Sequence, residues 1–554
     1  MSTSSHDSTS AAVARPIEGV PSPDGHSTII DTDYVIGQDN FSTGFKGLRL
    51  DLHSKVFAWS SIVVVFFATI TLALPDTMGS FFNATRSLLT DNLSWAFMVS
   101  TNLFVLLAIA LIFSPLGKVR LGGTEARPDF SYLGWFAMLF AAGMGVGLMF
   151  YCVSEPLTYF DDLLAGTSGP LGQQLATESS AKSLSMATSI FHWGLHPWAT
   201  YAIIALALAL FAFNKGLPLT IRSIFYPVLG ERVWGWPGHI IDVMAVFATL
   251  FGLATSLGLG ASQASAGLHY LFDVPNDNTT MVLLVVGITV ITLLSVIAGV
   301  EKGVRRISQV NMSLAFLLMV FVIVVGPTVL IMTGAMNNLA AYLNNLPALS
   351  NPVGRDDQGF VQGWTAFYWA WWVSWSPFVG MFIARVSRGR TVREFLIAVL
   401  IVPTVVSVFW MTSFGETALF QLANGYEGAK NAALELQLFS MLDQLPMASL
   451  TSLVGIVLVM VFFITSSDSG SLVIDAITSG GKVTSPKTQR VFWVTVEAVL
   501  AIALLLGGGL TALQAAVLIT GVPFMLVVLL SGYSVVQGLL SEPRIDNRMK
   551  KVLT

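Results

Sequence analysis

Long apolar segments recur along the whole chain and are separated by shorter segments that collect the polar and charged residues. A helix needs about 20 apolar residues to cross a membrane. Twelve segments meet that length, near 56–75, 93–116, 130–152, 185–213, 238–268, 281–300, 309–333, 363–384, 394–414, 448–477, 490–507 and 511–538. Several are longer than a straight span requires, so tilt or a break is expected there. The pattern predicts an all-α integral membrane protein with 12 transmembrane helices.

The basic residues test this map independently. With the N-terminus inside, the five inner loops hold 16 of the 28 Lys and Arg residues, and the two tails share eight. The outer loops hold only four, Arg86, Lys182, Arg355 and Lys430. This bias obeys the positive-inside rule, and one missed or extra helix would scramble it. We therefore expect both termini in the cytoplasm.

Composition excludes several classes of function. Only 11% of the 554 residues are charged and 54% are hydrophobic, whereas soluble domains carry roughly 25% charged residues. The net charge of −4 argues against nucleic acid as a partner. The single cysteine, Cys152, excludes an internal disulfide and thiolate metal clusters. The chain has no HExxH, Gly-x-Ser-x-Gly, CxxC or phosphate-loop motif. We therefore expect neither an enzyme nor an organic cofactor. An ion channel is also not expected, because the sequence contains no segment that resembles a selectivity filter.

The two ends of the chain differ from the apolar region between them. The first 45 residues carry six carboxylates against Arg15 alone and lack the features of a signal peptide. We expect a disordered acidic cytoplasmic tail over 1–50, a membrane domain over 51–539 and a short cytoplasmic tail over 540–554. The stretch 335–350 is amphipathic and too short to span, which predicts an interfacial helix on the outer face.

Glycines interrupt the predicted helix 130–152. Gly143, Gly145 and Gly147 alternate, which is the wrong spacing for a helix-packing motif alone. Each weakens a helix by about 1 kcal/mol, and a break in lipid is tolerated where the freed backbone groups face a ligand, ions or protein. Close helix packing is the alternative interpretation. We expect the helix to end near Glu155-Pro156, on the outer side.

Two aromatic clusters lie in the middle of predicted spans. Four of the 14 tryptophans, Trp369, Trp371, Trp372 and Trp375, fall within seven residues of 363–384. The span 185–213 contributes Trp193, Trp198 and Tyr201, where Gly194 and Pro197 loosen the helix. Aromatic walls are a recurrent solution for binding quaternary ammonium groups. Core packing explains either cluster alone, but two clusters beside a broken helix favour a binding site. His192 and His196 have no third ligand nearby, so we expect packing or hydrogen bonding there.

The span 448–477 contains five consecutive polar residues, Thr465 to Ser469. Such a run is costly in a membrane unless it serves a cavity. Sodium prefers hard oxygen ligands, which hydroxyls and backbone carbonyls can supply. Hydroxyls that bond back to the preceding helical turn are the alternative.

Together these segments resemble the betaine–choline–carnitine transporter (BCCT) family, most of all its bacterial sodium-coupled glycine betaine symporters. The resemblance runs from about residue 50 to 538, and the tryptophan segment with its continuation through Arg390 is its most specific part. It implies a LeuT-like core of two inverted five-helix repeats, helices 3–7 and 8–12. It also implies a bacterial inner-membrane location, a homotrimer, and alternating-access uptake of compatible solutes in osmoprotection. Membrane lipids are further expected partners, with anionic lipid contact at the arginine-rich inner loop after 363–384.

The resemblance also assigns roles to residues. The aromatic box for the substrate would be Trp193, Trp198, Tyr201 and Trp372, with Trp371, Trp375 and Phe150 lining the path and helping to hold the carboxylate end. Backbone around Gly143, Gly145 and Gly147 would let the ligand sit close. Sodium would be held by the carbonyls of Ala141, Met144 and Phe462 and the hydroxyls of Thr465 and Ser466.

Three features bear on coupling and substrate. The family's second sodium site uses paired threonines, but here Thr249 is followed one turn later by Leu253, which puts that site in doubt. The family's sodium-independent exchangers place an arginine in helix five, and 242–268 has no Lys or Arg. Choline carriers tend to have Asp where this chain has Gly147, which favours a zwitterion. The leading interpretation is sodium-coupled uptake of glycine betaine, ectoine or proline, with dimethylsulfoniopropionate equally compatible. A sodium-independent exchanger of carnitine- or choline-type amines is the alternative.

Overall fold

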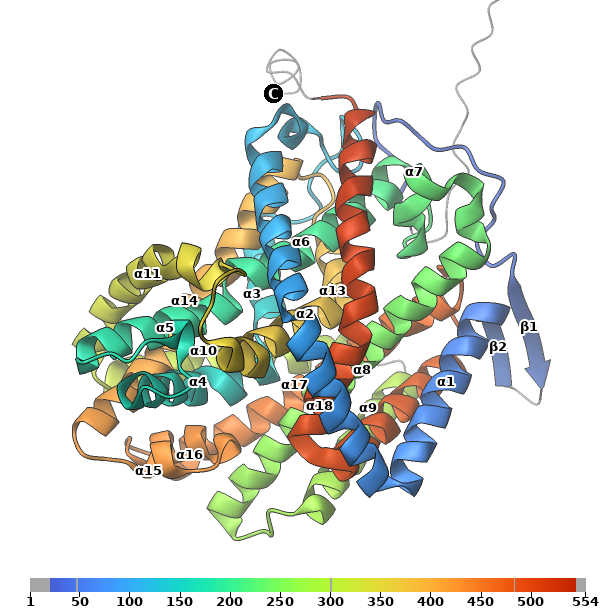
Figure 1. Cartoon of the computed structure of the whole chain (residues 1–554). Coiled ribbons are helices and arrows are strands. Elements are labelled where there is room, and N and C mark those ends of the chain that lie inside the picture. Colours follow the sequence, from blue (N-terminus) through green and yellow to red (C-terminus); the bar gives the residue numbers. More distant parts are fainter. Residues whose placement is uncertain (1–19, 46–47, 299–300, 483, 545–554) are drawn as a thin grey trace, which may run out of the picture.

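The computed structural model describes residues 20–45, 48–298, 301–482 and 484–544. Helices make up most of this part of the chain, and its one strand pair is an antiparallel hairpin at the edge (Figure 1). The strands are β1 (Asn40–Phe45) and β2 (Leu48–His53), and the helices are α1 (Ser54–Ala73), α2 (Pro75–Phe113), α3 (Tyr132–Gly143), α4 (Val146–Ala165), α5 (Glu178–Trp193), α6 (Leu195–Ala209), α7 (Tyr226–Leu229), α8 (Trp236–Phe272), α9 (Asn278–Ala298), α10 (Glu301–Val325), α11 (Thr328–Ser350), α12 (Gln358–Phe360), α13 (Ala366–Val386), α14 (Val392–Ala423), α15 (Gly428–Asn431), α16 (Gln437–Asp443), α17 (Ala448–Thr478) and α18 (Lys487–Leu540).

Within the described ranges, nine helices are long and apolar enough to cross a membrane, or up to ten if the bent pair α3 and α4 forms one span. This count does not reproduce the predicted twelve. Helix α13 is not among the nine, because its tryptophan, serine and proline residues lower its mean hydropathy. Helix α18 counts once, although it covers both predicted spans 490–507 and 511–538.

Three helices are broken at glycines. Helices α3 and α4 meet at a 64° bend on either side of Met144 and Gly145. Helices α5 and α6 are separated only by Gly194. Within α18, Gly508 and Gly509 have φ values of 157° and 58°, a region that glycine enters without the steric cost of a Cβ. The structure thus confirms the predicted breaks in 130–152 and near Gly194.

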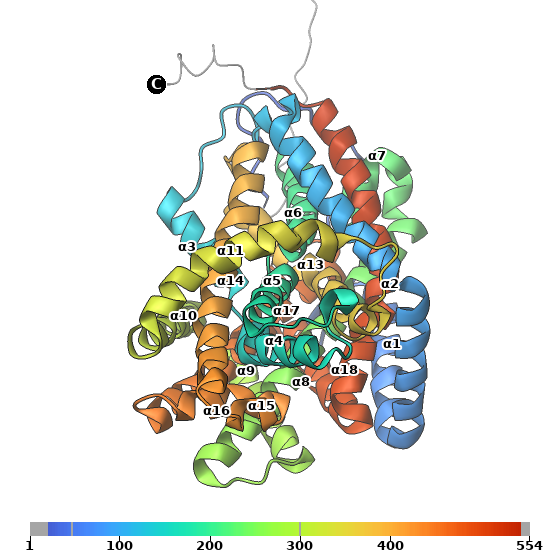
Figure 2. The same cartoon turned by 60° about the vertical axis from the view of Figure 1, so that its left-hand side comes forward.

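The helices that carry the aromatic clusters pack together in the centre of the molecule. Helix α6 lies against α13, and both helices also contact α18. The two tryptophan-rich segments therefore face one another. The long helices α2 and α18 run side by side in both ribbon views (Figures 1 and 2). The bundle therefore places the candidate site between its central helices.

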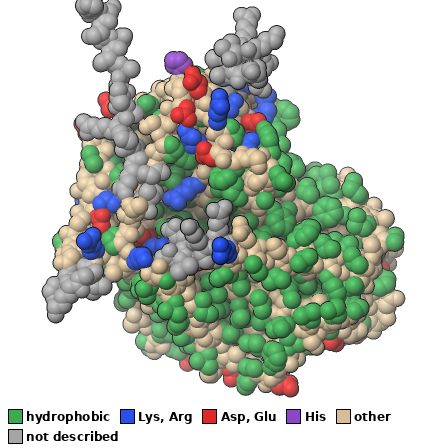
Figure 3. Space-filling model, turned by 180° about the vertical axis from the view of Figure 1, so that it is seen from behind, with side chains coloured by type: hydrophobic (Ala, Val, Ile, Leu, Met, Phe, Trp, Pro, Cys, Tyr) green, Lys and Arg blue, Asp and Glu red, His purple; other side chains and the backbone are tan. Residues whose placement is uncertain are grey.

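Most of the charged side chains in this view gather at one end of the molecule, while the broad face below them carries hydrophobic side chains among other uncharged atoms, with a few acidic side chains at its lower edge (Figure 3). Backbone pairing joins two predicted inner loops at Arg120 and Thr391. Predicted outer residues pair with one another elsewhere, as in Lys182 with Glu416 and Lys430 with Asp161. In these contacts, predicted inner loops meet inner loops and predicted outer residues meet outer residues, as the charge bias requires.

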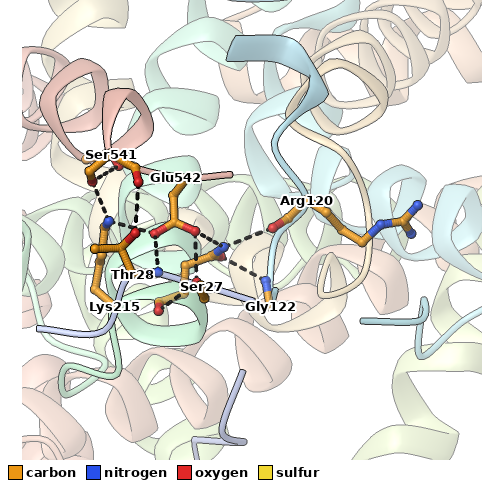
Figure 4. A network of polar contacts seen from close by, with 9 residues as sticks. Ser27, Thr28, Arg120, Gly122, Lys215, Ser541 and Glu542 are labelled. Carbon is orange, nitrogen blue, oxygen red and sulfur yellow. Dashed lines mark hydrogen bonds and ion pairs between the residues drawn. The ribbon is translucent and has the colours of Figure 1, made fainter. Parts of the chain in front are cut away.

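The N-terminal segment 20–53 differs from the expected disorder, and residues 1–19 lie outside the described residues. Its polar side chains bond to groups far along the chain, which composition cannot reveal. Figure 4 shows Glu542 at the centre of one such contact: its carboxylate accepts from Ser27 Oγ at 2.8 Å and from the Thr28 N–H at 3.1 Å, and it pairs with Lys215 Nζ at 2.6 Å. Arg388 pairs with Asp24 at 2.5 Å.

The same segment continues to the β-hairpin along the charged end. The Tyr34 hydroxyl accepts a 2.7 Å hydrogen bond from buried Arg222, and Asp51 of β2 pairs with Lys482. At the start of α1, the side chain of His53 accepts from the Val56 N–H and caps the helix. Residues 20–45 and 48–53 thus form an ordered strap across the helix ends.

The amphipathic stretch 335–350 is helical, but its helix α11 begins earlier, at Thr328. Asn338 donates to Glu416 of α14 at 3.0 Å, and Glu416 also pairs with Lys182 of α5. Helix α11 is therefore anchored to the bundle by a buried polar contact on its inner side.

Candidate functional site

The site begins at the break between α3 and α4. Met144 and Gly145 have extended backbone conformations, and the residues from Ala141 to Leu148 line a cavity. A helix end leaves backbone N–H and C=O groups without helical partners. The break therefore presents polar backbone to the cavity in the middle of an apolar bundle, as the three alternating glycines predict.

Aromatic rings from α5, α6 and α13 form the opposite wall of this cavity. The ring centroids of Trp193 and Trp372 lie 4.8 Å apart at 71°, and those of Trp198 and Tyr201 lie 5.3 Å apart at 78°. Tyr201 lies 6.3 Å from Trp372 at 80°. These edge-to-face pairs turn ring faces in different directions around one space. The four rings of the predicted box thus come together in one cavity.

Hydrogen bonds fix most of the indoles. Trp372 Nε1 donates to the carbonyl of His192 at 3.0 Å, and Trp375 Nε1 donates to the carbonyl of Gly252 at 2.9 Å. Trp371 is stacked on Trp372 at 5.1 Å, but its Nε1 has no hydrogen-bond partner among the described residues. Trp371 therefore brings a buried donor, unpaired within the described ranges, into the wall of the cavity that it lines.

Phe150 is the one predicted substrate residue that does not line the cavity. It is buried on α4 and contacts Tyr151, at a centroid distance of 4.8 Å. The remaining predicted substrate residues, Trp193, Trp198, Tyr201, Trp371, Trp372, Trp375, Gly143, Gly145 and Gly147, all line it. Phe150 is therefore one layer behind the predicted substrate path.

The predicted sodium ligands come from the two sides of the same cavity. Ala141 lies just before the helix break and Met144 lies in it. From α17, the cavity is lined by Phe462, Thr465 and Ser466. The Thr465 hydroxyl bonds to the carbonyls of Val461 and Phe462 at 3.0 and 3.2 Å. Its oxygen keeps acceptor capacity while it donates. The five residues thus line one cavity, and Thr465 also shows the back-bonding predicted as the alternative.

At the position in doubt for a second sodium site, the side chain of Leu253 packs against a neighbouring helix. Leu253 of α8 is buried, and a Cβ placed on Gly470 of α17 would lie 2.3 Å from its Cδ1. The Thr249 hydroxyl donates to the carbonyl of Ala245 at 2.8 Å. Leu253 therefore contributes a close α8–α17 contact in place of an oxygen ligand.

The cavity continues toward the charged end of the molecule. Along α13 its lining runs from Trp371 through Phe378 to Phe382, and Ser308 of α10 contributes from the same side. On the other side of the rings lies a buried polar group centred on Glu155 and His192, whose side chains approach within 3.1 Å. The rings thus separate the cavity from this polar group.

Glu155 was not predicted to be part of the site. The helix was expected to end near Glu155-Pro156, but α4 runs on to Ala165 and Glu155 is fully buried. Its Oε1 accepts from Trp193 Nε1 at 2.7 Å. A carboxylate inside an otherwise apolar segment is the signal that identifies such a residue from sequence. His196 also has a partner, Asn102 Oδ1, at 2.9 Å.

Comparisons with known proteins agree with this geometry. The model of the BCCT family, described as betaine/carnitine/choline family transporters, matches residues 55–544. A glycine betaine/proline/choline transporter of Vibrio parahaemolyticus is 56% identical over 96% of this chain and 98% of its own length. A glycine betaine/proline/choline/ectoine transporter of the same organism is 50% identical over 93% and 91%. The glycine betaine transporter OpuD of Bacillus subtilis is 42% identical over 86% and 93%.

A manganese transporter structure from Eremococcus coleocola has a TM-score of 0.42 and 13% identity, over 76% of this chain and 87% of that chain. That likeness is too weak to bear on the present fold. The sequence relationships are far stronger, because they cover nearly the full length of both partners at 42–56% identity. The chain therefore belongs to the betaine/carnitine/choline (BCCT) family of transporters and is a multi-pass membrane transporter, not an enzyme.

Proposed function

We propose that the protein couples the inward movement of sodium to the uptake of a zwitterionic compatible solute, with glycine betaine as the first candidate. The observation that carries this proposal is the aromatic cluster of Trp193, Trp198, Tyr201 and Trp372 beside a broken helix. The relatives' names include glycine betaine, proline, ectoine and choline. The physiological role would be osmoprotection.

The aromatic rings suit the ammonium end of such a substrate. A trimethylammonium group has no N–H to donate, so it gains from ring faces instead of hydrogen-bond acceptors. Each cation–π contact contributes roughly 0.5–2 kcal/mol, most when desolvated. Trp193 and Trp372 at 4.8 Å form the core of this subsite.

The carboxylate end needs hydrogen-bond donors. Trp371 lines the cavity, and its buried Nε1 has no partner among the described residues. The backbone of Gly145 lies beside open space, because a Cβ built there would meet nothing within 4 Å. We assign the carboxylate to this side of the cavity, with Trp371 as a donor.

Sodium coupling is supported by the ligand set. Oxygen atoms from the helix break and from Thr465 and Ser466 of α17 line one cavity, and oxygen donors are what hard cations prefer. An ion held between them would stabilise one arrangement of α3 and α17 over another. A co-substrate drives alternating access only through such differential affinity.

The finer architecture belongs to the same proposal. Twelve spans follow if the bent pair α3 and α4 is one span and if α13 and each half of α18, on either side of Gly508 and Gly509, also cross the membrane. The family then implies two LeuT-like inverted repeats, a homotrimer and both termini in the cytoplasm of a bacterial inner membrane, with lipid contacts at the charged end.

Two alternatives are open to the same test. A sodium-independent exchanger of carnitine or choline would use the rings in the same way, but it is disfavoured by the absence of Lys or Arg in 242–268. Choline lacks a carboxylate, and Gly147 favours a zwitterion over it. Because one relative's name includes choline, it enters the test as a competitor.

The deciding experiment is uptake of radiolabelled glycine betaine into proteoliposomes, with an inward sodium gradient or with potassium in its place. Unlabelled proline, ectoine, carnitine and choline serve as competitors. We expect accumulation only with sodium and competition by the zwitterions. Equal uptake in potassium, accelerated by substrate loaded inside, would replace the symporter with an exchanger.

A further inference from the structure

A buried carboxylate with an unusually complete set of donors lies directly behind the aromatic cluster. Glu155 is fully buried, and its Oε1 accepts from Trp193 Nε1 at 2.7 Å and from the Tyr368 hydroxyl. Its Oε2 accepts from the Tyr159 hydroxyl at 3.1 Å and lies 3.1 Å from His192 Nδ1. Four donors from α4, α5 and α13 thus surround the two oxygens.

This arrangement suits an ionised carboxylate. A buried carboxylate is costly unless its oxygens are hydrogen-bonded, and here both are. His192 Nε2 lies 3.1 Å from the Thr365 hydroxyl, so a neutral ring can donate from Nδ1 and accept at Nε2. The cluster therefore supplies hydrogen-bond donors to both carboxyl oxygens without a lysine or arginine.

The bond from Trp193 connects this charge to the substrate subsite. Trp193 is the ring nearest Trp372 in the cluster, at 4.8 Å. Its backbone carbonyl also accepts from Ser407 Oγ at 2.9 Å, so both ends of the residue are held. Charge-assisted hydrogen bonds are shorter and stronger than neutral ones, and an indole whose N–H donates to an anion gains electron density over its ring faces.

We propose that Glu155 is a positioning residue for the quaternary ammonium group: its carboxylate fixes the Trp193 indole and raises the electron density of the ring face that meets the cation. The inference rests on the proposed function, because it requires a trimethylammonium substrate in the aromatic cluster. It predicts that Glu155 acts through the indole N–H and not through its charge at a distance.

A double-mutant cycle tests this directly. We expect Glu155→Gln to raise the KM for glycine betaine by about 5–20-fold with Vmax changed by no more than about twofold, since a ground-state cation–π contact is weakened. In the Trp193→Phe background, where no N–H exists, the same change should alter KM by less than about twofold. Additive effects would show that Glu155 acts independently of Trp193 and would overturn the inference.

The control is Tyr159→Phe, which removes a donor to Glu155 that belongs to no ring of the cluster. We expect its KM to stay within about twofold of the parent value, because the Trp193 bond is retained. A KM rise as large as that of Glu155→Gln would assign the effect to general damage of the buried network.

A second substitution guards against misfolding of Glu155→Gln. Replacing Trp193 with 3-benzothienylalanine preserves ring size and removes only the N–H, and we expect the same KM increase. An unchanged KM would overturn the inference without any change at Glu155.

The cycle also separates the two proposals. If the parent protein transports glycine betaine or choline, both of which carry trimethylammonium, an additive cycle rejects only the role of Glu155. If the parent transports neither compound, the inference fails, whereas the proposed function fails only if no zwitterionic solute is taken up with sodium.

Discussion

Gly147 lies so close to Trp193 that a Cβ built on the glycine would be 2.5 Å from Cη2 of the indole. The same Cβ would be 2.8 Å from Cη2 of Trp371. Gly147 is inside α4, so its backbone conformation suits any residue, and the requirement for glycine is one of space. The last glycine of the motif thus sets how near two indoles approach the helix break.

Gly147→Ala is therefore expected to raise the KM for glycine betaine by about tenfold or more, because overpacking a rigid site costs about 1–3 kcal/mol. Gly145→Ala is the comparison within the motif, since its Cβ meets nothing within 4 Å, and its effect should be several-fold smaller. Initial rates of uptake at varied substrate concentration give both values. Equal effects at the two glycines would contradict the steric explanation.

Trp372→Leu should raise the KM for glycine betaine by about 3–30-fold, because it removes one ring face worth roughly 0.5–2 kcal/mol to a bound cation. The matched control is Trp95→Leu on the outer face of α2, where the indole is 56% exposed. The same uptake assay applies. If Trp372→Leu leaves KM unchanged, the aromatic cluster is core packing and not a binding site.

Thr465→Ala and Ser466→Ala should each raise the sodium concentration for half-maximal uptake by about tenfold, because each removes one oxygen ligand worth on the order of 1–2 kcal/mol. Ser469→Ala is the control: its hydroxyl lines the same cavity but is outside the predicted ligand set. Sodium titration of betaine uptake measures the shift. A shift for Ser469→Ala alone would move the ion to another part of α17.

Glu542→Ala should release the first part of the strap, because that carboxylate bonds to Ser27, Thr28 and Lys215. Hydrogen exchange of residues 20–35 is expected to accelerate by about tenfold or more, as these backbone groups lose their packing. Glu427→Ala, at an exposed position before α15, is the control. Unchanged exchange in Glu542→Ala would mean that the strap is held mainly at its other contacts.

The helix breaks and the aromatic cluster could be predicted because their signals are local. Three glycines within five residues remove helix propensity wherever the chain places them, and mid-span tryptophans do not fit the interfacial positions typical of that residue. The break at Met144 and the approach of Trp193 to Trp372 agree with that prediction. Phe150 was misplaced because it is adjacent to the motif but points to Tyr151.

The contacts of Glu155 and of the strap could not be predicted because their partners are distant in sequence. A glutamate followed by proline has the local pattern of a helix end, and only Trp193, Tyr368 and His192 make its burial favourable. Likewise, the composition of the first 45 residues indicates disorder. The contacts that hold residues 27 and 28 involve Lys215 and Glu542, which no local window includes.

The contact between Ser27 and Glu542 also constrains the order in which the protein can assemble. The two residues are 515 positions apart, and α18 ends only two residues before Glu542. During synthesis the N-terminal part emerges first, but its carboxylate partner is made only after α18. This contact of the strap can therefore form only after every helix from α1 to α18 has been synthesised, which makes it a late step in assembly.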